Sequence, residues 1–482
     1  MQRAAIQKIL GLLLMVISIS MFPPVMVSWL YADGAMFSFI LAFFATLLGG
    51  TALWYPVKGF QKEMRLRDGF IVVAMFWLVL GVSGSLPLIL ASTPDLSITD
   101  SVFESISGLT TTGATVITGL DDLPQSILYY RHQLQWLGGM GIIVLAVAVL
   151  PMLGIGGMQL YRAETPGPMK DAKLTPRIAE TAKALWYIYL GLTIFCAFAY
   201  WAAGMTLFDA ICHSFSTIAI GGFSTHDLSM GFFESALIEI VAVVFMILAG
   251  VNFSLHFLAW RSFSYRPYFA DAEFVAYLKV LLMVSLITMM YLYITGTFEA
   301  GGAIHNGLFQ AVSIGTTSGF TTAEYHNWPG FLPALLLLTS FIGGCAGSTG
   351  GGMKVIRVLL LLKQGMREVI RLIHPNALVP VKVGGNLLEE RVVDAVWGFF
   401  SLYVGSFIVM ALLLAASGLD LVTAFSAVAA CMNNLGPGLG DVGSNYAGIN
   451  DVAKWILCFA MILGRLEIFT VLVLLTPAFW RK

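Results

Sequence analysis

Ten stretches of the sequence are each long and apolar enough to cross a lipid bilayer as a helix. A crossing helix needs about 20 mostly apolar residues, because the hydrocarbon core is about 30 Å thick. The chain is 58% hydrophobic and only 11% charged, whereas soluble domains contain about 25% charged residues. The sequence therefore predicts an all-α polytopic membrane protein, with spans near residues 5–30, 36–57, 69–92, 132–160, 183–204, 235–260, 274–296, 330–362, 392–417 and 453–478.

Basic residues gather in alternate connections between these spans. They lie near residues 3–8, 58–67, 162–177, 261–266, 363–382 and 481–482. The other connections are acidic, with only Arg131 and Lys454 as basic residues. Because cytoplasmic loops carry an excess of lysine and arginine, the basic connections and both termini are predicted to be cytoplasmic. The N-terminus resembles a signal peptide, but two prolines and bulky residues stand at the cleavage position, so we expect an uncleaved first span.

Four outward connections share a glycine-centred pattern. The aligned segments are TTTGATV (110–116), AIGGFST (219–225), TTSGFTT (316–322) and NNLGPGL (433–439). The residues thirteen positions before the shared glycines are typical helix N-caps, namely Asp100, Asp209, Asn306 and Thr423. From each cap to its glycine there is room for a helix of about three turns, which is too short to cross the bilayer. Four copies in register indicate four repeats of span, short helix, glycine segment and span.

The repeated segments can form an ion path. Taken singly, each could equally be a glycine-rich turn between helices. Non-helical backbone at membrane depth, however, must be buried in protein or line a watery path, since lipid cannot hydrogen-bond to it. Rings of backbone carbonyls form ion filters, and the C-terminal ends of four short helices would favour a cation. The segments contain no Asp or Glu, which favours a monovalent cation over Ca²⁺ or Mg²⁺.

The motifs also carry a resemblance to a known family. The segments TTTGATVITGLDDLP, AIGGFSTHD, TTSGFTT, FIGGCAGSTGGGMKVIRVLLLLKQG, NNLGPGLG and GRLEIFTVLVLLTPAFWR resemble the potassium-translocating membrane subunits of bacterial Trk uptake systems, in the Trk/Ktr/HKT superfamily. The resemblance runs the full length of the chain. It implies a potassium channel-like fold with fourfold pseudosymmetry, divided into two N-terminal helices and four pore repeats at 1–67, 68–162, 163–268, 269–375 and 376–482.

The resemblance further implies a function and partners. A homodimer with one pore per subunit would take up potassium across the bacterial inner membrane. A cytosolic ring of RCK/KTN-type nucleotide-binding subunits would regulate it. The chain contains no nucleotide-binding fold, so NAD(H) or ATP/ADP would bind only to that partner, and K⁺ would be the transported ion rather than a cofactor. The net charge of −1 gives no sign of a nucleic-acid partner.

The resemblance places the potassium-binding filter on three residues of each glycine segment. These are Thr111, Thr112 and Gly113; Ile220, Gly221 and Gly222; Thr317, Ser318 and Gly319; and Asn434, Leu435 and Gly436. In related plant transporters a serine at the first glycine position accompanies sodium transport, so Gly113 indicates potassium. The fourth segment differs, with Asn433 before Asn434 and Pro437 after the glycine, as in fourth repeats of the family.

The eighth predicted span is interrupted by the sequence GGCAGSTGGG at 343–352. Each glycine costs a helix about 1 kcal/mol relative to alanine, so regular helix is not expected there. By resemblance this intramembrane loop is a gate, formed by Gly343, Gly344, Gly347, Ser348, Thr349, Gly350, Gly351 and Gly352. The alternative is a glycine patch for close helix packing. A phosphate-binding P-loop is excluded because Met353 separates the last glycine from Lys354.

Arg465 lies within the tenth predicted span, where a central charge costs about 2.5–3.5 kcal/mol and so indicates function. The resemblance makes it a barrier to ion flow at the gate. The alternative is a structural contact with an acid such as Glu239 or with loop carbonyls.

Two other classes of protein remain alternatives. A symporter coupling potassium to protons or sodium would place ionisable groups near a midplane site, and the filter segments have none. A membrane enzyme would need a nucleophile, base or metal cluster, but the seven histidines show no metal-ligand spacing. His213 is expected to pack or hydrogen-bond. The basic runs 162–180 and 363–376 fit either docking of the regulatory ring or attraction to anionic lipid.

Overall fold

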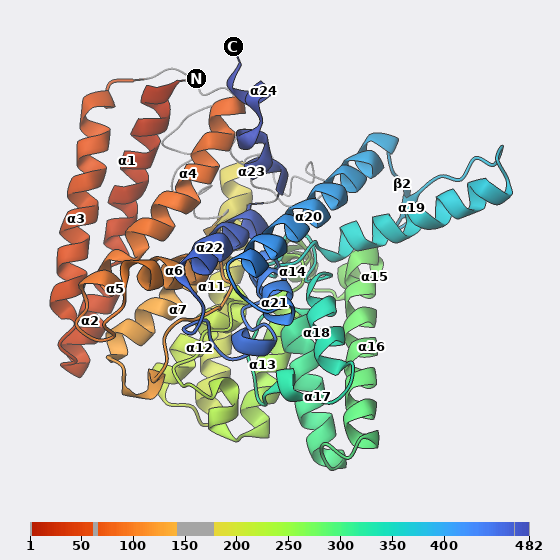
Figure 1. Ribbon diagram of the computed structural model, residues 1–482, viewed down its shortest axis with the longest axis horizontal. Coiled ribbons are helices and arrows are strands. Elements are labelled where there is room, and N and C mark those ends of the chain that lie inside the picture. Colours follow the sequence, from red (N-terminus) through yellow and green to blue (C-terminus); the bar gives the residue numbers. More distant parts are fainter. Residues whose placement is uncertain (1, 61–65, 142–177, 467, 482) are drawn as a thin grey trace.

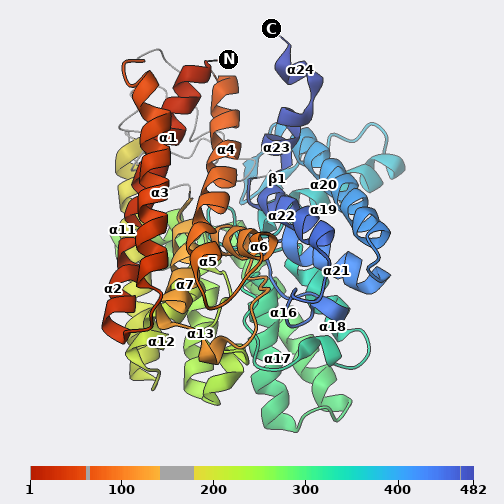
Figure 2. The same cartoon turned by 60° about the vertical axis from the view of Figure 1, so that its left-hand side comes forward.

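The described part of the chain is a bundle of helices. Its N-terminus and C-terminus lie on the same side of the molecule (Figures 1 and 2). The computed structural model describes residues 2–60, 66–141, 178–466 and 468–481. In this part the only strands are a short antiparallel hairpin, β1 (Lys382–Val383) and β2 (Asn386–Leu387). The all-α polytopic fold predicted from the sequence is confirmed.

Six helical stretches in the described residues are long and apolar enough to cross a membrane. They are Arg3–Tyr31, Met36–Val57, Arg67–Leu90, Lys183–Ala202, Ala272–Ile294 and Glu390–Ala416. Two further helix pairs reach that length only when both members are counted together, because each pair is bent by more than 40°. The predicted span at 132–160 falls largely outside the described residues, as do Lys62, Arg65 and the basic run 162–177.

The N-terminal helices pack as a pair beside the rest of the bundle (Figure 1). They are α1 (Arg3–Ile19), continued by α2 (Phe22–Tyr31), and α3 (Met36–Trp54), which ends in the 3-10 turn η1 (Tyr55–Val57). Gly11 of α1 and Gly50 of α3 let the two backbones approach closely: a side-chain carbon added at Gly50 would lie 2.8 Å from the carbonyl oxygen of Gly11. Small residues at such contacts are typical of membrane helix pairs.

The remaining helices follow one order four times. Each repeat begins with a long helix: α4 (Leu66–Gly84) with α5 (Leu86–Leu90), α11 (Ile178–Ala202), α16 (Ala272–Ile294) and α20 (Glu390–Ala416). A short pore helix follows in each: α6 (Ile98–Leu109), α12 (Leu207–Ala219), α17 (Ala300–Gly315) and α21 (Leu421–Met432). After the glycine segment comes a 3-10 turn: η2 (Leu120–Asp122), η5 (Ser229–Phe233), η6 (Tyr325–Asn327) and η7 (Gly440–Val442).

The helices that follow the glycine segments are broken more often than the sequence predicted. They are α7 (Gln125–Gly139), α13 (Ala236–Ala249) with α14 (Phe253–Ser262), α18 (Leu332–Ser340) with α19 (Val355–Ile373), and α22 (Asp451–Arg465) with α23 (Ile468–Leu475). The break between α18 and α19 was predicted. The bend of 94° between α13 and α14 was not, nor was the break between α22 and α23. Short helices α15 (Arg266–Ala270) and α24 (Pro477–Trp480) complete the described part.

The predicted caps of the pore helices are wrong by three residues in three repeats and by seven in the third repeat. The capping side chains are Ser97, Thr206 and Asp420, and α17 begins after Glu299 without a side-chain cap. Asp100 and Asp209 lie in the first turn instead, where each accepts a hydrogen bond from the capping hydroxyl. This reciprocal arrangement explains the error, because an Asp three residues after Ser or Thr also fits the first helical turn.

Replacing Gly50 by alanine should separate α1 from α3 and destabilise the protein by about 1–3 kcal/mol, because the added carbon has no room. Gly49, its neighbour on the same helix, has nothing within 4 Å of an added side-chain carbon. Gly49→Ala should therefore be neutral or slightly stabilising, since alanine favours the helix. Thermal unfolding of both variants in detergent tests this prediction, and equal midpoints would contradict it.

Candidate ion-conduction site

The four glycine segments meet in a closed ring. A side-chain carbon added at Gly113 would collide with the carbonyl oxygen of Gly221 in the second repeat. The same relation holds from Gly222 to Ser318 and from Gly319 to Leu435. The ring closes where an added carbon at Gly436 would lie 2.7 Å from the carbonyl oxygen of Thr112. Each glycine thus lies against the carbonyl oxygen of the residue just before the glycine in the next repeat. The contacts run from the first repeat to the fourth, and the fourth repeat contacts the first.

The segments share an unusual backbone. The glycines have φ of 81°, 76°, 82° and 97°, and the residues two positions earlier are also positive, with φ of 56° at Thr111, 54° at Ile220, 68° at Thr317 and 52° at Asn434. Non-glycine residues rarely adopt this conformation, and such strain is found where function requires it. The same strain at one position of all four repeats shows that the tertiary structure imposes a common path on different side chains.

Hydrogen bonds to the pore helices hold this path. The amide before each glycine donates to the carbonyl five residues earlier, at 2.8–2.9 Å, in the pairs Thr112–Ser107, Gly221–Ser216, Ser318–Ser313 and Leu435–Ala430. These amides are therefore bonded to the C-terminal ends of the pore helices. Each pore helix ends directly before the ring, and a helix C-terminus carries about half a negative charge. The four helix ends together favour a cation at the ring.

The carbonyl of Gly221 in the ring has a side-chain partner. Gln135 of α7 donates from Nε2 to the carbonyl of Gly221 at 2.6 Å, and its Oε1 accepts from the amide of Phe223 at 3.2 Å. Gln135 is fully buried. The second segment is thus fixed by an amide side chain from the first repeat.

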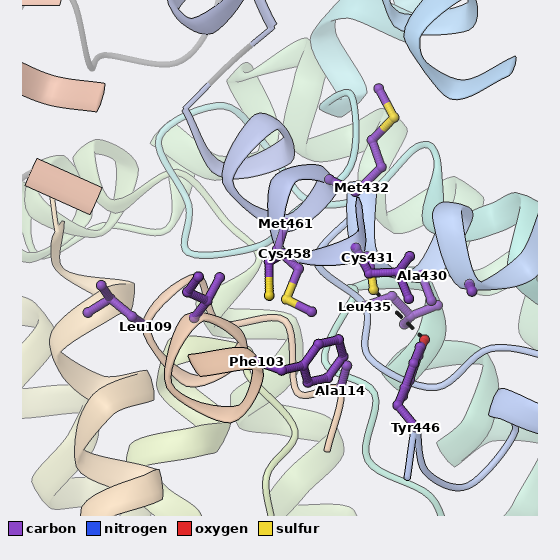
Figure 3. Close-up of a cluster of buried hydrophobic side chains, with 14 of the residues drawn as sticks. Phe103, Leu109, Ala114, Ala430, Cys431, Met432, Leu435, Tyr446, Cys458 and Met461 are labelled. Carbon is purple, nitrogen blue, oxygen red and sulfur yellow. Dashed lines mark hydrogen bonds between the residues drawn. The ribbon is translucent and has the colours of Figure 1, made fainter. Parts of the chain in front are cut away.

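Side chains join the fourth segment to the first. Asn434 donates from Nδ2 to the hydroxyl of Thr112 at 2.9 Å. The Tyr446 hydroxyl donates to the carbonyl of Gly436 at 2.7 Å, while its amide donates to the carbonyl of Thr115 at 2.8 Å. Around Tyr446, apolar side chains from α6, α21 and α22 pack together with Leu435 of the fourth segment, and Phe103 of α6 is among them (Figure 3). The closing contact of the ring is therefore both hydrogen-bonded and tightly packed.

A buried ion pair supports the first segment. Arg131 Nε lies 2.8 Å from Glu104 Oε1, and the two side chains are 1% and 0% exposed. Glu104 also accepts from the amide of Val116, and Arg131 donates to the carbonyl of Ser224 in the second repeat. Breaking a buried pair costs about 3–5 kcal/mol, because one charge remains uncompensated. The sequence analysis had assigned Arg131 to an outward loop, whereas it lies within α7.

A vestibule with a volume of about 240 Å³ lies outside the ring, and all four ring glycines contribute to its wall. Asp227, Glu324 and His226 also line it. His226 Nδ1 lies 2.5 Å from Asp121 Oδ1, and its Nε2 lies 3.6 Å from Asp209 Oδ1. This imidazole connects the outer loop of the first repeat to the pore helix of the second.

The glycine loop at 343–352 lies on the other side of the ring, against three repeats. The hydroxyl of Thr349 donates to the carbonyl of Ile218 at 2.8 Å, at the end of the second pore helix. The amide of Gly351 donates to the hydroxyl of Thr317 at 2.6 Å, and that of Gly352 donates to the carbonyl of Asn433 at 3.0 Å. The loop is thus bonded to residues at or just before the second, third and fourth segments.

Arg465 completes this layer from the first-repeat side. Its Nη1 donates to the carbonyl of Thr349 at 3.1 Å, and its Nη2 donates to the carbonyl of Gly138 at 2.8 Å. Contact with loop carbonyls was one of the two arrangements expected from the sequence. Glu239, the acid named as the other expected partner, lies 3.1 Å from His305. Below the loop, a cavity of about 80 Å³ is lined by Arg465, Lys354, Arg357 and Asn434, among others.

The structure brings together the residues that the sequence singled out. All twelve predicted filter residues belong to the four segments, and Thr349, Gly351 and Gly352 lie beneath them. His213 is buried and hydrogen-bonds to the Asp209 carbonyl and the Ser224 hydroxyl, as expected. The sequence analysis missed the supporting residues Glu104 and Gln135. A signal for Glu104 existed, since it is a carboxylate inside an otherwise uncharged stretch of the first pore helix.

These features define a class of protein: a polytopic membrane protein with four pore-helix repeats arranged around one axis. Comparison with known sequences identifies the family. The TrkH family profile, described as a cation transport protein, matches residues 35–482. The chain belongs to this family of cation transport proteins.

Relatives with established names span the whole chain. It is 58% identical to the Trk system potassium uptake protein TrkH of Vibrio parahaemolyticus, over all of both chains. It is 54% identical to TrkH and 44% identical to TrkG of Escherichia coli strain K12, over 97–99% of each chain. The crystal structure of the potassium transporter TrkH from Vibrio parahaemolyticus matches with a TM-score of 0.91 at 56% identity, covering 100% of both chains.

The contact between Asp121 and His226 should make the stability of the outer loops depend on pH. Partial burial alone lowers the pKa of His226, but the carboxylates of Asp209 and Asp121 outweigh it and raise the pKa above 6.5. For Asp121, burial alone raises the pKa, but the His226 contact outweighs it and lowers the pKa below 3.8. The stabilisation is therefore complete from about pH 4 to 6.5 and is lost as the pH rises through the raised pKa of His226.

The test compares wild type with His226→Gln at about pH 6 and about pH 8.5. The wild type should be more stable by up to about 1 kcal/mol at the lower pH, and this advantage should disappear at the higher pH, because the pair is partly exposed to water. Asp121→Asn should reduce the same pH-dependent difference without abolishing it, because the carboxylate of Asp209 still raises the pKa of His226. A stability advantage that does not change with pH would contradict the charged contact.

Proposed function

We propose that this chain takes up potassium across the bacterial inner membrane, through the ring formed by its four glycine segments. The observation that carries this proposal is the closure of the ring, in which each glycine lies against a carbonyl oxygen of the next repeat. Close relatives are named as potassium uptake proteins, and a ring of neutral oxygens suits a weakly hydrated monovalent cation.

The filter residues in this proposal are the twelve around the ring. Backbone carbonyls of Thr111, Thr112, Ile220, Gly221, Thr317, Ser318, Asn434 and Leu435, together with the four glycines, would replace the hydration shell of K⁺. The positive φ values at two positions of every segment support this role, because alternating backbone conformation turns successive carbonyls toward one side. The repeat boundaries near residues 68, 163, 269 and 376 belong to the same proposal.

The gate in this proposal is the glycine loop with Arg465. Its support is the position of Thr349, Gly351 and Gly352, which bond to residues at or just before three of the four segments. Arg465 adds a positive charge on the same side, joined to the loop through Thr349. A cation leaving the ring toward the cavity would meet this layer. Its opening would therefore control flux.

The family name supports further parts of the proposal. Relatives belong to Trk systems, which implies other Trk components at the membrane. A homodimer regulated by a cytosolic ring of RCK/KTN-type subunits, which bind NAD(H) or ATP/ADP, fits the absence of a nucleotide-binding fold from the sequence. Both termini would face the cytoplasm, in agreement with the basic loops.

Coupled symport with protons or sodium is the alternative mechanism. It would require ionisable groups at the ion site, and none of the twelve filter residues is ionisable. The deciding experiment is ⁸⁶Rb⁺ uptake into potassium-loaded proteoliposomes that contain this chain alone, with and without a pH or sodium gradient. Uptake that follows the potassium gradient and ignores the others supports conduction. Uptake that requires one of them supports symport.

Replacing Gly113 by serine should admit sodium. The added side chain would collide with the Gly221 carbonyl and disturb the ring. We expect the preference for potassium over sodium to fall about tenfold, which corresponds to ~1.4 kcal/mol. Gly119→Ser is the matched control, because Gly119 also has positive φ but nothing lies within 4 Å of an added side-chain carbon. Unchanged selectivity in Gly113→Ser would count against the filter assignment.

Deleting residues 347–351 should increase leak. The deletion removes the contacts of Thr349 and Gly351 beneath the ring, so ⁸⁶Rb⁺ flux without any regulatory partner should rise while selectivity is retained. A leak equal to that of the wild type would remove the gate from the proposal.

A further inference from the structure

Glu273 connects the glycine loop to two helices. It lies in the first turn of α16, and its side chain is buried. A single oxygen, Oε1, accepts hydrogen bonds from the amide of Ala346 at 2.7 Å and from the amide of Ile356 at 3.0 Å. Ala346 is within the loop, and Ile356 is the second residue of α19. One carboxylate oxygen therefore fastens the loop and the helix that follows it to a third element.

The bond to Ile356 supplies a cap that α19 lacks. The residue before this helix, Lys354, has φ of 78° and makes no side-chain capping hydrogen bond to it. First-turn amides of a helix have no partner within the helix, and a carboxylate near them is favoured by the helix dipole. Glu273 thus serves as a cap from another helix, and the cap exists only while α16 and α19 keep their present positions.

The loop is held on its opposite side by the bend between α13 and α14. The amide of Cys345 donates to the carbonyl of Gly250 at 2.9 Å, and the amide of Phe253 donates to the carbonyl of Gly347 at 3.0 Å. These are bonds between backbone groups, so no side-chain substitution removes them directly. Glu273 is therefore a place where a side chain from outside the loop bonds to its first half.

From this geometry we infer that Glu273 is a positioning residue, which keeps the glycine loop closed under the ring by bonding Ala346 and Ile356 together. A displacement of α19 away from α16 breaks the hydrogen bond between Ile356 and Glu273 Oε1. Because the same oxygen also accepts from the amide of Ala346, that bond to the loop is then weakened. In Figure 1, α19 extends away from the body of the bundle, so a displacement of its far end acts on this contact. The inference rests on the proposed gating function of the loop.

Cys345 provides a reporter of loop position that does not depend on ion flux. It precedes Ala346 and is buried, as are the other four cysteines, Cys196, Cys212, Cys431 and Cys458. The experiment measures alkylation by N-ethylmaleimide, cysteine by cysteine, using mass spectrometry of the full-length chain in proteoliposomes. ⁸⁶Rb⁺ leak is measured on the same samples. The four other cysteines report any general loosening of the structure.

Glu273→Ala should accelerate alkylation of Cys345 on the order of tenfold, because both hydrogen bonds to the Glu273 side chain are lost. The other four cysteines should be unchanged, and the leak should rise. Glu273→Gln keeps an oxygen at the same position and should react within about twofold of wild type.

The outcomes separate this inference from the proposed function. Unchanged alkylation in Glu273→Ala would overturn the positioning role, as would equal acceleration in Glu273→Gln. Faster alkylation of Cys345 in Glu273→Ala alone, with leak unchanged, would support the positioning role and overturn the loop as the gate.

Discussion

The structure depends on the need of buried backbone groups for hydrogen-bond partners. Within a bilayer there is little water to bond with peptide groups, and each unsatisfied group costs several kcal/mol. This chain nevertheless carries four extended segments and a glycine loop inside the helical bundle. They are possible because the pore helices accept their amides, from Thr112 to Ser107 and equivalently in the other repeats. The helices of the bundle can be understood as the support for this irregular backbone.

The same requirement explains why several buried polar side chains bond to the ring segments. Gln135, Asn434 and Tyr446 each bond a backbone group of a segment or a side chain of the next one. The ion pair of Arg131 with Glu104 adds charge where neither residue could remain alone. These groups are chemically different in each repeat, although the backbone they support is nearly the same. Pseudosymmetry is therefore a property of the main chain, and each repeat reaches it with its own side chains.

The sequence was enough to predict the fold class and the positions of the segments, because these depend on hydropathy and on a glycine pattern repeated four times. Local rules were less successful. The caps were misplaced, since Asp100 and Asp209 also fit the first turn next to Ser97 and Thr206. The bends after Ala249 and Arg465 were missed, because mostly apolar residues resume beyond each of them. Contacts such as Glu273 with Ala346 and Ile356 join residues more than 70 positions apart, and no local pattern indicates such pairs.

The ring of four unequal segments has a consequence for how such a pore can change. In a channel built from four identical subunits, one codon alters all four walls at once. Here a single substitution alters one segment and leaves the other three unchanged. Ion selectivity can therefore change in small steps. The fourth segment, with Asn433, Asn434 and Pro437, already differs while preserving the same backbone path. In a single chain of this kind, substitutions can accumulate in one segment independently of the other three. The four segments can therefore acquire different roles.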